Sequence, residues 1–229
     1  MPKRNYKWLF ASLAVLGLTL DLASKYYVFK WLYNDGQTTS DGKFDTWTIA
    51  EPWHPDDSDH IVGGRYNLVP GWFGFTAEYI PGSKPCDCSF HGLQSWSAPL
   101  MPRVNQGALF GMGGDHKGLA NRIFAAISIL AAAGIVIWAV RKGREMDGWM
   151  TAALGLILGG TLGNLFDRIV FNGVRDFLYF YKIKWPVFNV ADCCLVCGAI
   201  MLLVHAFLIA PPENAAKSEP APAPTPPSA

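Results

Sequence analysis

The sequence predicts a mainly α-helical, polytopic membrane protein with four transmembrane helices and a small β-sheet cradle on the membrane surface. Charged residues make up 16% of the 229 residues, against about 25% in an average soluble protein. The apolar residues, 51% of the chain, gather into stretches close to the roughly 20 residues that cross a bilayer. A formal charge of +1 argues against a basic nucleic-acid-binding protein, and five cysteines are too few for a disulfide framework in a chain of this size.

Four apolar stretches are the predicted spans. They cover residues of about 8–32, 123–140, 149–170 and 187–209. With the segments between them they form one membrane domain over residues 1–210. The chain then continues as a Pro/Ala-rich tail, 211–229, which we expect to be disordered and cytoplasmic because it lacks the residues of a packed core.

Lysine and arginine in the short flanks set the predicted orientation. Basic clusters precede the first span and join the second to the third: Lys3, Arg4 and Lys7, then Arg141, Lys142 and Arg144. The segment 34–104 instead holds nine acidic residues and four basic ones. Both termini should therefore face the cytoplasm, with 34–121 and 171–186 outside. The second outer segment argues against this orientation because it contains Arg175, Lys182 and Lys184, but the two inner clusters together contain more basic residues.

The N-terminus also fits a cleaved signal peptide. Its basic residues are followed by the apolar run Trp8–Leu20, and Leu22-Ala23-Ser24 is compatible with a cleavage site. We favour an uncleaved first span, because it keeps the number of crossings even, as the two inner basic clusters require.

Polar residues of three spans converge at one depth in this topology. They are Asp21 and Lys25 on the first span, Asn164, Asp167 and Arg168 on the third, and Asn189 and Asp192 on the fourth. Asp21 and Lys25 are four residues apart and share a helical face. At about 1.5 Å per residue, Asp192 lies about 8 Å below the outer boundary. The convergence indicates a site at the outer-leaflet interface.

Ionisable side chains inside a span cost roughly 2.5–3.5 kcal/mol each on insertion scales, so they indicate function. Two neighbouring carboxylates shift each other's pKa and share a proton. In aspartic-peptidase chemistry one of them takes a proton from water while the other polarises the carbonyl. Asp21 with Lys25 and Asp167 with Arg168 can equally be neutralising pairs. Asp192 has no cation within a turn of its helix, and Asp176 is its candidate companion.

Four ordered motifs carry a family resemblance. Asp21-Leu-Ala-Ser-Lys25 is similar to a DxxSK block, and Asn105-Gln-Gly-Ala-Leu-Phe110 to an NxGAxF block. Gly160-Thr-Leu-Gly-Asn-Leu-Phe-Asp-Arg168 with Gly173-Val-Arg-Asp-Phe177 is similar to GNxxDR…GxVxDF, and Phe188-Asn-Val-Ala-Asp192 to FNxAD. In these blocks the sequence resembles the lipoprotein signal peptidases (signal peptidase II), four-span aspartic peptidases of bacterial inner membranes.

The resemblance implies removal of signal peptides from diacylglyceryl-modified prolipoproteins, with cleavage just before the lipid-bearing cysteine. It implies that Asp176 and Asp192 are the catalytic pair, on the periplasmic side of the inner membrane. Polar neighbours would orient the substrate and the aspartates: Asn105, Gly107, Asn164, Arg168 and Asn189. Asp21 and Lys25 would hold the first helix against the site, and Asp167 would anchor Arg168.

The resemblance implies no metal and no organic cofactor. The expected partners are the prolipoproteins, membrane lipids and cyclic-peptide inhibitors that block the aspartate pair, and no nucleic acid. We expect a monomer.

The sequence departs from the family pattern between Asp21 and Asn105, which are further apart than usual. The run 68–79 is similar to the strand-like run that normally precedes NxGAxF, so extra sequence falls at 34–66 and 80–102. The aromatic residues of this run favour a small sheet at the membrane interface. For the two insertions we favour tolerated loop growth on an outer surface over a lid.

Cysteine and histidine motifs are treated as structural. The loop from His54 to His60 matches no metal-ligand spacing, so we favour a solvated acidic loop. A bridge between Cys86 and Cys88 would be strained, which leaves free thiols or pairing with another protein open. Three cysteines on the fourth span, Cys193, Cys194 and Cys197, are expected to pack as small apolar residues.

Two other functions compete with the peptidase. Intramembrane charges also mark ion-coupled carriers. Four spans without an internal repeat, and polar groups confined to one boundary, argue against a carrier. A catalytically silent lipopeptide-binding relative is disfavoured because both candidate aspartates are present.

Overall fold

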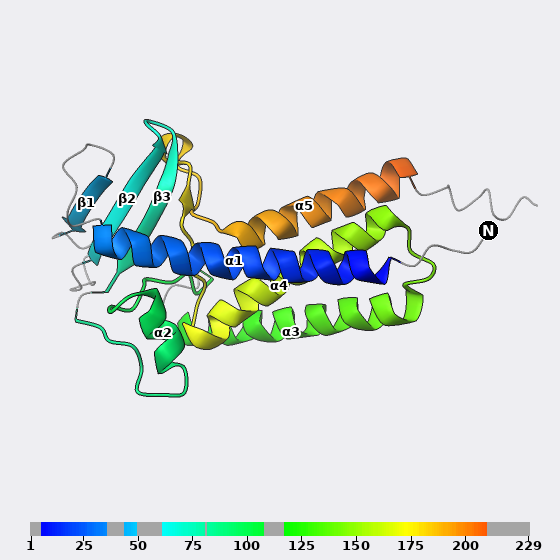
Figure 1. Cartoon of the computed structure of the whole chain (residues 1–229), viewed down its shortest axis with the longest axis horizontal. Helices are drawn as coiled ribbons and strands as arrows, with labels where there is room; N and C mark the ends of the chain where they lie inside the picture. The colour runs from blue at the N-terminus through cyan, green and yellow to red at the C-terminus, as the bar shows by residue number, and fades with distance from the viewer. Residues whose placement is uncertain (1–5, 36–43, 50–60, 81, 108–116, 210–229) are drawn as a thin grey trace, which may run out of the picture.

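Four long helices form the body of the protein. The computed structural model describes residues 6–35, 44–49, 61–80, 82–107 and 117–209. The helices are α1 (Lys7–Asp35), α3 (Lys117–Lys142), α4 (Gly148–Val170) and α5 (Val190–Val204), which continues as the π-helical η3 (His205–Ile209). All four are long and apolar enough to cross a membrane, so the described part of the chain contains the predicted four candidate spans. Figure 1 shows the sheet and the short helix α2 at one end of this bundle, and the α3–α4 connection at the other.

Two helix boundaries differ from the prediction. α3 begins at Lys117 rather than near residue 123, because the buried side chain of Asn121 fixes its N-terminal part to the end of α4. There Asn121 Nδ2 donates to the carbonyl oxygen of Arg168 (3.2 Å) and to Asn172 Oδ1 (3.0 Å). α5 begins at Val190, because the preceding residue, Asn189, is its N-cap.

α4 packs against each of the other three long helices. Glycines at four-residue spacing, Gly155, Gly159 and Gly163, face α1 along its length. A Cβ on Gly159 would lie 2.7 Å from the carbonyl oxygen of Ala14 and 3.2 Å from the Cα of Gly17. Helices in lipid gain little from apolar burial, so small residues that let backbones approach stabilise their packing.

A four-stranded antiparallel sheet lies at the C-terminal end of α1. Its order is β1 (Phe44–Ile49), β2 (Ile61–Val69), β3 (Phe73–Tyr79) and β4 (Leu178–Tyr179). The run 68–79 is therefore not one strand, since it contains the turn between β2 and β3, where Gly71 has φ +79°. The described part of the insertion 34–66 supplies β1 and most of β2. It extends the sheet, so loop growth is a wrong description of that part.

The second insertion, 80–102, contains the short helix α2 (His91–Ser97), which the sequence did not predict. Gln94 fixes α2 to the end of α4, because its Nε2 donates to the carbonyl oxygen of Val170 (2.6 Å). Its Oε1 accepts the backbone N–H of Cys86 (2.8 Å). Cys86 and Cys88 form a disulfide with their Cα atoms 5.3 Å apart, within the usual range for a bridge, so neither is a free thiol.

Several sequence predictions lie outside the described residues. These are the acidic loop His54–His60, the last three residues of the NxGAxF block and the tail 211–229. Within the described ranges, no group of three or more His, Cys, Asp or Glu side chains is placed to hold a metal ion. The α5 cysteines are unbonded, and Cys194 Sγ lies 3.4 Å from where a Cβ on Gly17 would be.

The close approach of α1 and α4 gives a stability prediction. Gly159→Ala should lower the free energy of unfolding by about 1–3 kcal/mol, because the new methyl group meets backbone atoms that cannot rotate away. Gly134→Ala on α3 is the matched control: its Cβ would enter open space, and it should be neutral or stabilising by up to about 1 kcal/mol. Unfolding of each variant in detergent, monitored by circular dichroism, measures the two changes in free energy. Equal stabilities would contradict the packing described here.

Candidate active site

Four charged side chains are buried together where α1 and α4 reach the sheet end. Asp21, Lys25, Asp167 and Arg175 are all 0% exposed. Lys25 Nζ lies 2.7 Å from Asp21 Oδ2 and 3.5 Å from Asp167 Oδ2, and Arg175 Nη2 lies 2.7 Å from Asp167 Oδ1. The pair predicted between Asp21 and Lys25 is present. Two carboxylates balance two cations, which is the condition under which charges are tolerated without water.

The predicted anchoring of Arg168 by Asp167 is wrong. Both oxygens of Asp167 accept hydrogen bonds from Arg175, including its backbone N–H at 2.9 Å. Arg168 Nη1 donates instead to the carbonyl oxygen of Asn164 (3.3 Å), and its guanidinium lies over the ring of Phe124. The reason is helical geometry: consecutive residues of a helix do not face each other.

Arg175 is the site residue that sequence reasoning missed, because it was counted as an outward-facing charge. Its guanidinium lies 3.9 Å from the ring centroid of Phe171 and 4.3 Å from that of Tyr26. Its Nη1 donates to Ser97 Oγ on α2 (3.1 Å). No spacing rule links residues 167 and 175, since the chain leaves the helix between them, so the fold alone reveals this pairing.

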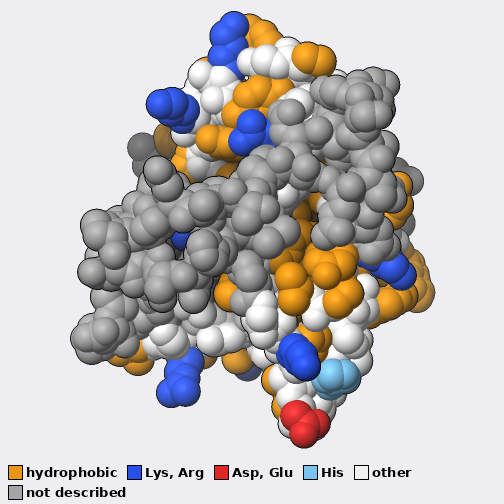
Figure 2. Space-filling view, turned by 90° about the vertical axis from the view of Figure 1, so that its left-hand side faces the viewer, with side chains coloured by type: hydrophobic (Ala, Val, Ile, Leu, Met, Phe, Trp, Pro, Cys, Tyr) orange, Lys and Arg blue, Asp and Glu red, His pale blue; other side chains and the backbone are white. Residues whose placement is uncertain are grey.

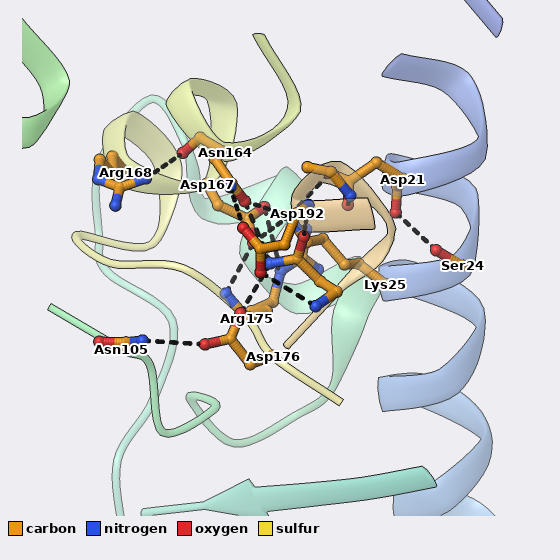
Figure 3. Close-up of polar contacts among 12 residues, drawn as sticks. Asp21, Ser24, Lys25, Asn105, Asn164, Asp167, Arg168, Arg175, Asp176 and Asp192 are labelled. Atoms are coloured by element: carbon orange, nitrogen blue, oxygen red, sulfur yellow. Dashed lines mark hydrogen bonds and ion pairs between the residues drawn. The ribbon is translucent and has the colours of Figure 1, made fainter. Parts of the chain in front are cut away.

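Lys25 also sets the orientation of the Asn164 amide. Its ammonium group, which only donates, bonds to Asn164 Oδ1 at 3.2 Å. The NH2 end of the same amide therefore points the other way, and Nδ2 donates to Asp192 Oδ1 at 2.9 Å. Figure 3 shows these side chains converging from α1, α4 and the start of α5.

Asp192 is fixed at the N-terminus of α5 by a reciprocal capping box. Asn189 Oδ1 accepts the backbone N–H of Asp192 (3.0 Å), and Asp192 Oδ2 accepts the backbone N–H of Asn189 (3.2 Å). The N–H of Ala191, in the same first turn, donates to Asp21 Oδ1 (2.9 Å). The positive end of the helix dipole lies next to this carboxylate.

Asp176 reaches the same place from the segment that follows α4. Backbone hydrogen bonds in both directions pair Asn105 with Val174 (2.8 and 2.9 Å), and so hold this segment. The Asp176 carboxylate accepts from Asn105 Nδ2 (3.0 Å) and from Asn189 Nδ2 (2.7 Å). Asn189 therefore bonds to both aspartates: its side-chain amide donates to Asp176, and its backbone N–H donates to Asp192.

Burial, as the largest cause, and the negative charge of Asp192 together raise the pKa of the Asp176 carboxyl to about 7. The hydrogen bonds from Asn105 and Asn189 act in the opposite sense, because they favour the ionised form. Asp176 keeps part of its surface exposed, so water reaches it. The site thus contains a carboxyl group that can hold or release a proton near neutral pH.

Gly107 fixes the orientation of Asn105. Its backbone N–H donates to Asn105 Oδ1 (2.9 Å), which turns the NH2 group toward Asp176. Gly107 has φ +106°, and a Cβ there would lie within 3.0 Å of the Phe124 ring, so glycine is required. The structure therefore brings together the seven residues expected at the centre of the site: Asn105, Gly107, Asn164, Arg168, Asp176, Asn189 and Asp192.

The fold and the site define a polytopic membrane protein with a paired-carboxylate site at one end of its helical bundle. Residues 91–208 match the family model of signal peptidase (SPase) II. A lipoprotein signal peptidase of Rhodopirellula baltica is 34% identical over 220 residues, which cover 90% of this chain and 74% of that protein. The chain belongs to the signal peptidase II family.

Other relatives match a shorter region. A lipoprotein signal peptidase of Pseudomonas syringae pv. tomato is 44% identical over 106 residues, 45% of this chain and 61% of that protein. One from Pseudomonas aeruginosa is 40% identical over 118 residues, 50% of this chain and 67% of that protein. A solved bacterial membrane enzyme, 19% identical, shares the fold with a TM-score of 0.57 over 92% of this chain and 99% of that one. The predicted fold class is therefore confirmed.

The buried cluster gives a second stability prediction. Asp167→Asn should lower the free energy of unfolding by about 3–5 kcal/mol, because it leaves Lys25 and Arg175 with one carboxylate between them. Lys142→Gln, which breaks the exposed pair with Glu145 (3.0 Å), should cost less than about 1 kcal/mol. Thermal unfolding of both proteins in one detergent tests this. A loss for Asp167→Asn no larger than that of the control would mean that the cluster contributes little.

Proposed function

We propose that this protein removes the signal peptides of diacylglyceryl-modified prolipoproteins by cleaving the peptide bond before the lipid-bearing cysteine, as an aspartic endopeptidase. One observation carries the proposal. Two carboxylates from separate segments, Asp176 and Asp192, share Asn189 as a hydrogen-bond partner at the end of a membrane-spanning bundle. Family membership supports the class of substrate, and the names of the relatives support prolipoproteins.

In the mechanism we infer, Asp192 is the base and Asp176 carries the proton. Asp192 accepts from Asn164 Nδ2 and the Asn189 N–H at a helix N-terminus, which suits an ionised carboxylate. Asp176, with a pKa of about 7, retains a proton that polarises the scissile carbonyl. Asp192 takes a proton from the attacking water, and that proton then passes to the leaving amine of the lipidated cysteine.

The remaining residues position this pair and the substrate. Asn105, Asn164 and Asn189 hold the two carboxylates through the hydrogen bonds described above. Arg168 interacts electrostatically with both aspartates, and we assign it, with Gly107, to contacts with the substrate backbone. The buried charged cluster supports the site through Asp21, Lys25 and Asp167.

We infer that the sheet end faces the periplasm of a bacterium and that the bundle spans its inner membrane. Figure 1 shows the N-terminal end of α1 and the α3–α4 connection together, opposite the sheet. The last turn of α3 and this connection contain Arg141, Lys142 and Arg144. The positive-inside rule assigns this end to the cytoplasm. A diacylglyceryl group in the outer leaflet would then bring the scissile bond to the depth of the aspartates. Cyclic peptides that occupy the pair should inhibit the enzyme, and we expect it to act as a monomer, because the seven site residues lie together in one chain.

Removing either aspartate should abolish cleavage. Asp176→Asn and Asp192→Asn should each lower kcat by at least about 10²-fold, because a proton-transfer group of the reaction is lost while the side-chain shape is kept. The measurement is cleavage of a lipidated prolipoprotein by purified protein, with folding checked by circular dichroism. The exposed Asp87 at the same end provides the matched control, and Asp87→Asn should retain full activity. Substantial turnover by either site variant would remove that residue from the pair.

Activity should depend on pH in a bell-shaped manner. As the pH rises through about 7, Asp176 loses its proton, so kcat/KM should fall on the alkaline side; protonation of the base should lower it on the acidic side. Asn105→Ala should move the alkaline limb to higher pH, because the lost hydrogen bond had lowered the pKa of Asp176. Gln106→Ala, which removes a bond to the carbonyl oxygen of Asn172, should leave the limb in place. A flat profile from about pH 5 to 9 would contradict the assignment.

A further inference from the structure

An exposed surface at the sheet end is built from two segments far apart in sequence. The β2–β3 turn lies against the segment around the 3₁₀ helix η2 (Tyr181–Ile183). Tyr181 Oη donates to the carbonyl oxygen of Val69 (2.9 Å), the Lys182 N–H donates to that of Trp72 (3.4 Å), and the rings of Phe73 and Phe180 lie 4.5 Å apart. We call residues 68–72 and 180–186 the tip surface.

The tip surface exposes large apolar side chains. Leu68, Val69, Trp72, Phe180, Ile183 and Trp185 are each between 38% and 63% exposed. Contiguous exposed apolar groups of this kind indicate contact with a partner or a membrane, and tryptophan favours the membrane–water interface. This composition is unusual for a surface that faces only water.

The tip surface is also basic. Lys182 and Lys184 are exposed, and residues 178–188 contain no Asp or Glu. Lys182 Nζ lies 3.7 Å from the centroid of the Trp72 ring, so a cation and an indole are already adjacent. Lys184 has φ +51°, a conformation uncommon for residues with a Cβ, and a lysine rather than glycine occupies it. Both lysines also lie in an outer segment, where the positive-inside rule predicts few basic residues.

The chain sets the depth of this surface. Trp185 lies four residues before Asn189, the N-cap of the membrane-spanning α5. Four residues reach at most about 14 Å even when fully extended. The backbone of Trp185 therefore lies within about 14 Å of the N-terminus of α5, the end that we place at the outer boundary of the bilayer. Figure 2 looks onto the sheet end, where Lys and Arg side chains stand beside hydrophobic ones and acidic side chains are scarce among the described atoms in view.

We propose that the tip surface binds anionic phospholipid headgroups of the adjacent leaflet. Lys182 and Lys184 pair with the lipid phosphate, while Trp72, Ile183 and Trp185 enter the interfacial layer beneath it. Charge complementarity favours an anionic lipid over a zwitterionic one. The bound lipid would hold β3 and β4 on the bilayer, and Asp176 lies two residues before β4, so the contact also fixes the height of the candidate active site.

Fluorescence quenching by brominated lipids tests the proposal without depending on enzymatic activity. The full-length protein is placed in phosphatidylcholine nanodiscs that contain equal fractions of either brominated phosphatidylglycerol or brominated phosphatidylcholine. The fluorescence of the tip surface is obtained as the difference between the emission of the wild type and that of the double variant Trp72→Phe/Trp185→Phe. We expect stronger quenching of this signal by brominated phosphatidylglycerol, and a smaller difference at high salt.

The lysine variants determine whether headgroup recognition is the cause. Lys182→Gln and Lys184→Asn should each reduce the preference about fivefold at low salt. Asparagine is used at residue 184 because it tolerates the left-handed conformation. Lys142→Gln, at the opposite end of the bundle, is the control and should leave the preference unchanged.

Four results would overturn the proposal. Equal quenching by the two lipids would indicate an uncharged membrane contact. An unchanged preference in the lysine variants would move the lipid site elsewhere, and absence of quenching would take the tip surface out of the bilayer. Shielding of the two tryptophans by an added lipopeptide, in place of lipid, would identify a substrate surface instead.

Discussion

The ammonium group of Lys25 is the interaction on which the rest of the site depends. It bonds to Asp21 on its own helix and to Asn164 on α4, and it lies 3.5 Å from Asp167. Asp21 in turn receives an N–H from the first turn of α5, and Asn164 turns its amide toward Asp192. One buried cation thus links α1 to α4 directly and to α5 through Asp21, and it orients a hydrogen-bond donor toward the candidate base. Because an unpaired buried charge costs several kcal/mol, this arrangement is strongly fixed.

The two carboxylates differ in how they are held, and this difference supports their separate roles. Asp192 belongs to a helix whose first turn is tied to α1, so its position follows the bundle. Asp176 belongs to an irregular segment fixed by Asn105 on one side and by β3 on the other, where Thr76 N–H donates to the carbonyl oxygen of Phe177 (2.9 Å). Asn189 contacts both, so the geometry of the pair depends on how the bundle and the sheet meet.

The sequence was sufficient for the features that follow local rules. Apolar length predicted the four spans, and four-residue spacing predicted the pair of Asp21 and Lys25. The pairing of Arg175 with Asp167 was not predictable, because the chain turns out of α4 between them and spacing no longer reports proximity. α2 and the first two strands were missed for a related reason: contacts between segments distant in sequence hold them in place, such as the hydrogen bond of Gln94 with Val170 and the packing of β2 against α1. Charge counting misread Arg175 because burial removes it from the surface balance.

The central claim is that the enzyme requires the diacylglyceryl group of its substrate. Cleavage of a matched pair of precursors tests this claim most directly. Purified wild-type protein would be given one prolipoprotein in its diacylglyceryl-modified and unmodified forms, and mass spectrometry would locate any bond that is cut. The account predicts cleavage of the lipidated form alone, with a product that begins at the lipid-bearing cysteine. Equal cleavage of both forms, or a cut at another bond, would contradict the claim that the lipid brings the scissile bond to the aspartates at the membrane boundary.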